Sequence, residues 1–174
     1  RGALYGFDDE AERYAFFCKA AVEMLSVLGY YPDVLHAHDW QAALSIAYLN
    51  FQYRWRREYQ NIKTVFTIHN IEYQGQFPDS ILGYVLGLDY SDYLEYGGCV
   101  NFMKGAIEMA NVVTTVSPRY SEEIRSEEYA HGLAPILNKN AHKLTGILNG
   151  IDYKYYNPAA DKEIFCNFES GELD

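Results

Sequence analysis

Two short segments carry the side chains best suited to chemistry. The first is His36-Ala37-His38-Asp39, where two histidines lie two residues apart. Because residues i and i+2 of a strand face the same side, this pair has the spacing of a metal site. The spacing is common, and a metal needs further ligands from other strands. A metal-dependent hydrolase using His36 and His38 therefore stays open beside a plain alternative, a buried His36 and a helix-capping Asp39.

The second segment starts at His69-Asn70 and continues through Gln74. It offers an imidazole, two amides, a phenol and a carboxylate, which are groups that hydrogen-bond a polyhydroxyl ligand. The alternative interpretation is turn chemistry, in which Asn70 supplies a bend and Gly75 adopts a positive φ. Composition alone does not separate the two.

A third segment, Asn149-Gly150, is a strong turn signal that also lets a backbone approach a ligand closely. Ser117-Pro118 has the form of a helix start, with Ser117 as the cap and Pro118 at the first helical position. Free amides at such a start attract anions mildly, but a plain cap explains the pair equally well.

The elements that position these segments alternate in type. The pattern predicts helices at residues 8–29, 40–57 and 100–110 and from 118 onward, and strands at 34–37, 63–68, 112–116 and 144–148. Asp8 is the predicted cap of the first helix and Gly29 its end, while residues 69–98 form a long irregular stretch. This order predicts an α/β fold, a buried parallel sheet with helices on both faces. Ligands of such sheets lie beyond the carboxyl ends of the strands, where all three segments fall.

Composition narrows the function classes. The 174 residues are 49% hydrophobic and 22% charged, which is typical of one globular domain. The net charge of −10 and the lack of a basic run argue against nucleic-acid binding. The longest uncharged stretch, 40–53, is too short and too polar for a membrane span. Three separated cysteines favour a reduced, cytoplasmic setting over a disulfide framework or zinc ribbon. No motif for a cofactor is present.

Taken together, the segments resemble one family. The likeness to bacterial glycogen synthase and plant starch synthase, in glycosyltransferase family five, runs from Leu4 to about Asp161. It is carried in the right order by Tyr5-Gly6 and by residues 8–13, 36–40, 65–70, 73–75, 115–120 and 146–152. The resemblance implies a GT-B type fold of two Rossmann-like domains. Residues 1–152 would be a partial N-terminal, acceptor-side domain, and residues 153–174 a linker or the start of the inter-domain region.

The resemblance also implies an activity. The parent protein would transfer glucose from ADP-glucose to the non-reducing end of an α-1,4-glucan with retention of configuration, without a metal or other cofactor. Carried over by position, His69 would lie beside the transferred glucose as the catalytic residue. Substrate-binding residues would be Asp39, Asn149, Tyr5, Asn70, Tyr73 and Gln74.

The departures from the family pattern set further expectations. The family's Lys-x-Gly-Gly loop is absent, as is the second domain that holds the donor phosphates, and the chain begins at Arg1 instead of Met. We therefore expect a piece of a longer enzyme, inactive alone and prone to self-association through an open sheet edge. A non-catalytic glucan-binding module stays open as another alternative. The location would be the bacterial cytoplasm, or the plastid in a plant, and the sequence does not distinguish ADP-glucose from UDP-glucose.

Overall fold

Among the described residues, four parallel strands form the sheet that carries the histidine segments. The computed structural model describes residues 2–89, 92–169 and 171. The strands lie in the order β1-β2-β6-β7, and each neighbouring pair is parallel. Their bounds are Val34–His38 for β1, Lys63–Ile68 for β2, Val112–Thr115 for β6 and Leu144–Gly146 for β7. The predicted parallel sheet is confirmed, and its carboxyl ends meet at one edge.

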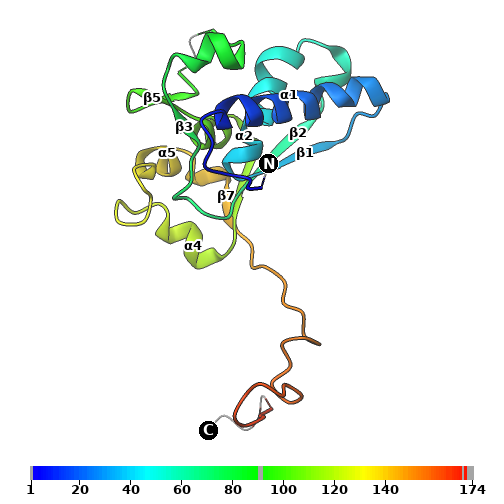
Figure 1. Ribbon diagram of the computed structural model, residues 1–174, viewed down its shortest axis with the longest axis vertical. Coiled ribbons are helices and arrows are strands. Elements are labelled where there is room, and N and C mark those ends of the chain that lie inside the picture. The colour runs from blue at the N-terminus through cyan, green and yellow to red at the C-terminus, as the bar shows by residue number, and fades with distance from the viewer. Residues whose placement is uncertain (1, 90–91, 170, 172–174) are drawn as a thin grey trace.

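Among the described residues, five α-helices accompany the sheet, together with shorter helical turns (Figure 1). The α-helices are α1 (Glu10–Leu28), α2 (Asp39–Tyr48), α3 (Phe102–Met109), α4 (Pro118–Glu123) and α5 (Ala134–Lys139). The shorter turns are η1 (Leu49–Tyr53), η2 (Arg57–Tyr59), η3 (Leu82–Leu86) and η4 (Ala141–Lys143). The flanking helices expected from the sequence are thus present.

The helix ends test the predicted caps. The first helix begins at Glu10 with Asp9 as its N-cap residue, so the prediction of Asp8 is wrong by one position. Gly29 closes the helix with a φ of 61°, the left-handed conformation that glycine adopts at little cost. Ser117 accepts a hydrogen bond from the Tyr120 N–H, and Pro118 occupies the first turn. These last two predictions are confirmed.

The two faces of the sheet differ in polarity. Ala37, Phe66 and Val113 are buried, and they join the residues of α2 and α3 in one core. By strand alternation the opposite face carries His36 and Thr67. The prediction that β1 is a buried strand is wrong, because β1 lies at the edge of the described sheet and Val34 is 47% exposed.

The long stretch after β2 folds locally. Its strands β3 (Gln76–Phe77) and β4 (Glu95–Tyr96) flank β5 (Cys99–Asn101) in a small antiparallel sheet. Asn101 then caps α3 by accepting a hydrogen bond from the Lys104 N–H at 2.9 Å. The helix predicted from residue 100 therefore begins two residues later, at Phe102.

After β7 the chain leaves the sheet. The described residues of 147–169 form neither a helix nor a strand, and the segment extends away from the body of the molecule (Figure 1). None of the helices among the described residues has both the length and the apolar character needed to span a bilayer. Cys18, Cys99 and Cys166 are all free thiols.

Candidate functional site

The carboxyl ends of β1 and β2 are joined by a side chain. Asp39 follows β1 directly, and its Oδ1 accepts hydrogen bonds from the N–H groups of His69 at 2.8 Å and Asn70 at 3.4 Å. Asp39 has a φ of 54°, a left-handed conformation that costs a residue other than glycine about 1–3 kcal/mol. Such strain persists where surrounding contacts fix it, and it gathers at functional sites. The structure thus brings together two of the predicted site residues, Asp39 and His69.

The ring of His69 belongs to a row of three imidazoles. His38 Nδ1 lies 3.0 Å from His69 Nε2, within hydrogen-bond distance, and the His36 and His38 ring centroids are 4.2 Å apart. His36 Nε2 is hydrogen-bonded to Thr67 Oγ1 at 2.6 Å. His36 is exposed, and not buried as one interpretation of the sequence had it. Its partial desolvation, followed by the neighbouring His38 and His69, holds its pKa below the ordinary value of 6.5.

This arrangement does not support the metal-dependent hydrolase. No group of three or more His, Cys, Asp or Glu side chains in residues 2–89, 92–169 and 171 is placed to hold a metal ion. Instead, the two histidines of β1 direct ring nitrogens to protein groups, His36 to Thr67 and His38 to His69.

An aromatic cavity lies next to these strand ends. It has a volume of about 790 Å³, within the range typical of small-molecule sites. Trp40, the neighbour of Asp39, forms part of its wall. The full lining is Tyr5, Gly6, Phe7, Asp8, Glu10, Trp40, Gln41 and Tyr73. Tyr5 and Tyr73, predicted from separate parts of the sequence, thus share one cavity and offer aromatic faces that suit sugar rings.

The segment before α1 is tied to the helix at several points. Glu10 Oε1 accepts hydrogen bonds from the Gly6 N–H at 2.5 Å and the Phe7 N–H at 3.4 Å. Arg13 Nη2 donates to the Leu4 carbonyl at 2.7 Å, and its guanidinium lies 5.6 Å from the Phe7 ring centroid. Gln41 Nε2 donates to the Tyr5 hydroxyl at 3.0 Å, which places that phenol at the cavity.

Sequence reasoning did not assign Phe7 or Gln41 to the site. Gln41 follows Asp39 by two residues, so its position beyond a strand end was a usable signal. The cavity-lining position of Phe7 is fixed by local contacts with the first turns of α1, because its N–H donates to Glu10 Oε1 and its ring lies under the Arg13 guanidinium.

The predicted residues after His69 differ in where their side chains lie and in what they contact. Asn70 Oδ1 accepts a hydrogen bond from the Glu72 N–H at 3.0 Å, and Gly75 has a φ of 66°, which are the features that the turn interpretation of this segment requires. Gln74 lies in the interior instead of on a wall. Its amide nitrogen donates to the carbonyls of Ile71 and His131, and its amide oxygen accepts from Asn101 at 2.7 Å. This side chain therefore holds the segment together.

Asn149 lies apart from this cluster. It is exposed and follows β7, which β6 separates from β2. Within the described part of the chain, no hydrogen bond or ring contact joins Asn149 to Asp39 or His69.

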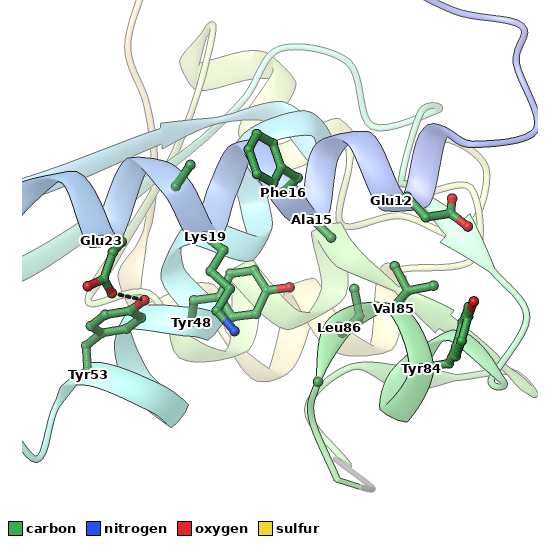
Figure 2. A pocket seen from close by; sticks show the side chains of 12 residues that line it. Glu12, Ala15, Phe16, Lys19, Glu23, Tyr48, Tyr53, Tyr84, Val85 and Leu86 are labelled. Carbon is green, nitrogen blue, oxygen red and sulfur yellow. Dashed lines mark hydrogen bonds between the residues drawn. The ribbon is translucent and has the colours of Figure 1, made fainter.

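A second hollow lies between α1 and η3 (Figure 2). Its volume is about 670 Å³, and it is lined by residues such as Phe16, Tyr48 and Tyr84. On its wall the Tyr53 hydroxyl donates to Glu23 Oε2 at 2.6 Å. None of its lining residues lies at the carboxyl end of a strand of the parallel sheet. The cavity beside Asp39 is therefore the candidate site.

Comparison with known proteins identifies the family. The family model of the starch synthase catalytic domain matches residues 1–139. The glycogen synthase of Desulforamulus reducens is 46% identical over 100% of this chain and 37% of its own length. That of Streptococcus gordonii is 45% identical over 99% of this chain and 37% of its length.

A solved structure agrees with these matches. It is the catalytic domain of starch synthase IV from Arabidopsis thaliana bound to ADP and acarbose. The TM-score is 0.82 at 39% identity, over 98% of this chain and 36% of that one. This likeness confirms the predicted GT-B type of fold. The chain spans little more than a third of the length of the relatives it matches. Neither the hydrolase nor the non-catalytic module is supported, and the chain belongs to the family of starch synthase catalytic domains.

Proposed function

We propose that this chain is the acceptor-side part of a retaining glucosyltransferase. The parent enzyme would transfer glucose from ADP-glucose to the non-reducing end of an α-1,4-glucan such as glycogen. The bond between glucose C1 and the donor phosphate oxygen breaks, and C1 bonds to the acceptor hydroxyl oxygen. The hydroxyl proton goes to the leaving phosphate, so no protein base is required.

The observation that carries this proposal is the fixed position of His69. Its backbone is hydrogen-bonded to Asp39, and the neighbouring cavity presents Tyr5 and Tyr73. In our proposal, the carbonyl of His69 stabilises the positive charge that develops on the sugar, and its ring holds a glucose hydroxyl. Orientation and electrostatics of this kind contribute most of the rate enhancement in many enzymes.

The substrates are inferred by comparison. The Arabidopsis structure was solved with ADP and acarbose bound, which supports an adenine nucleotide donor and an oligosaccharide acceptor for this chain as well. Asp39, Tyr5, Tyr73, Asn70 and Asn149 are the proposed substrate-side residues. Gln74, buried among internal hydrogen bonds, is proposed only to hold in place the segment that carries Tyr73.

The test uses the full-length enzyme with His69→Ala. We expect kcat to fall by about 100-fold or more, since a positioned polar group at a charged transition state has an effect of that size. Transfer of labelled glucose to glycogen measures the rate. The matched control is His142→Ala, because His142 is exposed on η4. A near-normal rate in the His69 variant, with the control also normal, would remove His69 from the site.

The 174-residue chain alone is proposed to be inactive. Departure of the donor phosphate needs fixed positive charge where negative charge develops. The segments 36–40, 67–70 and 148–150 contain neither Lys nor Arg, and the chain has a net charge of −10. Glucose transfer by the purified 174-residue chain would contradict this statement.

The division of the chain and its location are also proposals. We place the acceptor-side domain at residues 1–152 and a linker or the start of the inter-domain region at 153–174, since the described residues after β7 form no helix or strand. We favour the bacterial cytoplasm over a plastid, since the bacterial relatives reach 46% identity and the plant structure 39%.

A further inference from the structure

His38 and His69 come from different strands and share a hydrogen bond. In the register of β1 and β2, His38 pairs with Thr67, and His69 lies two residues further along the chain. The His38 Nδ1 and His69 Nε2 atoms are 3.0 Å apart, and the ring planes are inclined by 32°. The bond thus fixes the ring of His69, whereas Asp39 fixes only its backbone.

A hydrogen bond between two neutral imidazoles couples their tautomers. One of the two nitrogens must carry the hydrogen and the other must present its lone pair. If His38 donates from Nδ1, then His69 carries its own hydrogen on Nδ1. If His69 donates from Nε2, its Nδ1 becomes an acceptor. The tautomer of His38 therefore decides whether Nδ1 of His69 donates a hydrogen bond to a ligand hydroxyl or accepts one from it.

His38 is in turn held from behind. Its ring lies against that of His36, with centroids 4.2 Å apart. His36 Nε2 is hydrogen-bonded to Thr67 Oγ1 at 2.6 Å, and Thr67 Oγ1 to Thr114 Oγ1 at 2.6 Å. Both threonines are only 8% exposed. His36, Thr67 and Thr114, which lie on three neighbouring strands, thus support the ring of His38. The other neighbour of that ring is His69.

We propose that His38 is a positioning residue for glucosyl transfer, which orients the His69 ring and selects its tautomer. The inference rests on the proposed function of His69 and assigns His38 no contact with the sugar. It also gives the His36-Ala37-His38 motif a role other than metal binding. His36 supports His38, and His38 presents His69.

Three substitutions at His38 in the full-length enzyme separate hydrogen bonding from packing. His38→Phe keeps a ring against His36 but removes the hydrogen bond, and His38→Ala removes both. His38→Asn places an amide near the position of Nδ1, where it donates or accepts. We expect kcat to fall by about tenfold in the Phe and Ala variants and to stay within about threefold of wild type in the Asn variant. The KM for glycogen should change by less than about twofold, because His38 does not bind acceptor.

A double-mutant cycle identifies the route of the effect. If His38 acts through His69, then His38→Ala has no further effect on kcat in a His69→Ala background. Additive losses would overturn the inference, as would a wild-type rate in the Phe variant or a loss in the Asn variant as large as in Ala. A wild-type rate in His69→Ala alone would instead refute the proposed role of His69. Melting temperatures within a few degrees of wild type confirm that each variant is folded. If the His38→Ala variant unfolds, the Asn and Phe variants still test the inference.

Discussion

Asp39 fixes the backbone of His69 from the neighbouring strand. The carboxylate oxygen of Asp39 accepts the His69 N–H at 2.8 Å, although Asp39 itself holds a left-handed φ of 54°. A hydrogen bond to a charged group contributes about 1.5–3 kcal/mol, which offsets a backbone strain of similar size. The contact therefore joins the ends of β1 and β2 at the point where the proposed sugar site begins.

Substitution of Asp39 should separate charge from geometry. We expect Asp39→Ala to lower kcat of the full-length enzyme by about 10- to 100-fold, because the His69 amide loses its acceptor. Asp39→Asn should lower kcat by a smaller factor, since asparagine keeps an acceptor oxygen and tolerates the left-handed conformation. Initial rates of glucose transfer measure both variants. Asp33→Asn, an exposed site before β1, is the control. Equal losses in Ala and Asn would show that the negative charge, and not the hydrogen bond, matters.

The aromatic walls of the cavity should govern acceptor binding. Tyr73 is 60% exposed and Tyr5 is 52% exposed, and both line the cavity beside Trp40. Loss of one ring face should cost about 1 kcal/mol of sugar binding, so Tyr73→Ala should raise the KM for glycogen by about fivefold. Steady-state kinetics of the full-length enzyme measure this change. Tyr84→Ala in the hollow of Figure 2 is the control, and an equal rise there would assign acceptor binding to that surface instead.

Gly75 is required for two separable reasons. Its φ is 66°, and an added Cβ would lie 2.6 Å from Cε3 of the buried Trp40 ring. Gly97 has a similar φ of 64° with nothing within 4 Å, so Gly97→Ala tests the conformational cost alone. We expect Gly97→Ala to destabilise the protein by about 1 kcal/mol and Gly75→Ala by about 2–4 kcal/mol. Urea denaturation measures both, and equal losses would mean that Trp40 yields without cost.

Local sequence signals predicted the sheet well. The β-branched residues of β2 and β6 indicated strands that the structure contains, and Gly29 and Ser117 marked helix ends correctly. These features depend on neighbours in sequence, which a single chain reveals. The exposure of β1 was missed because an edge strand and a central strand can have the same composition, and only the strand order distinguishes them.

The site was harder to predict than the sheet. Asp39 and His69 were selected because both follow strands, and the structure joins them by a hydrogen bond. The contact of His38 with His69 depends on the register of β1 against β2, which no local pattern specifies. The same holds for Gln74, whose partner Asn101 lies 27 residues away, so its burial among internal hydrogen bonds was not foreseen.

Acid should weaken the fold through His36. The pKa of His36 lies below its ordinary value of 6.5 in the folded state, so the unfolded chain binds a proton more readily. This group therefore has no effect on stability well above pH 6.5 and destabilises the fold increasingly as pH falls below that value. Partial desolvation of His36, followed by the neighbouring His38 and His69, is the cause of this lowered pKa.

The measurement compares melting temperatures of the wild type and His36→Gln at about pH 7.5 and about pH 5.5. Glutamine keeps a polar group near Thr67 but does not titrate. We expect the wild type to lose more thermal stability than the variant between the two pH values. An equal loss in both proteins would show that His36 does not contribute to the acid sensitivity.

The edge of the sheet should make the isolated chain self-associate. In the part of the chain that the structure describes, β1 has a neighbouring strand on one side only, and Val34 on it is 47% exposed. Such an edge offers unpaired backbone groups to a second copy, and a lysine on the strand opposes that pairing. We expect the 174-residue chain to sediment as dimers or larger species and Val34→Lys to shift it toward the monomer. Val27→Lys is the control on a different surface, because Val27 lies on α1 and is 77% exposed. A monomeric wild-type chain, or dissociation by the Val27 variant alone, would refute pairing through β1.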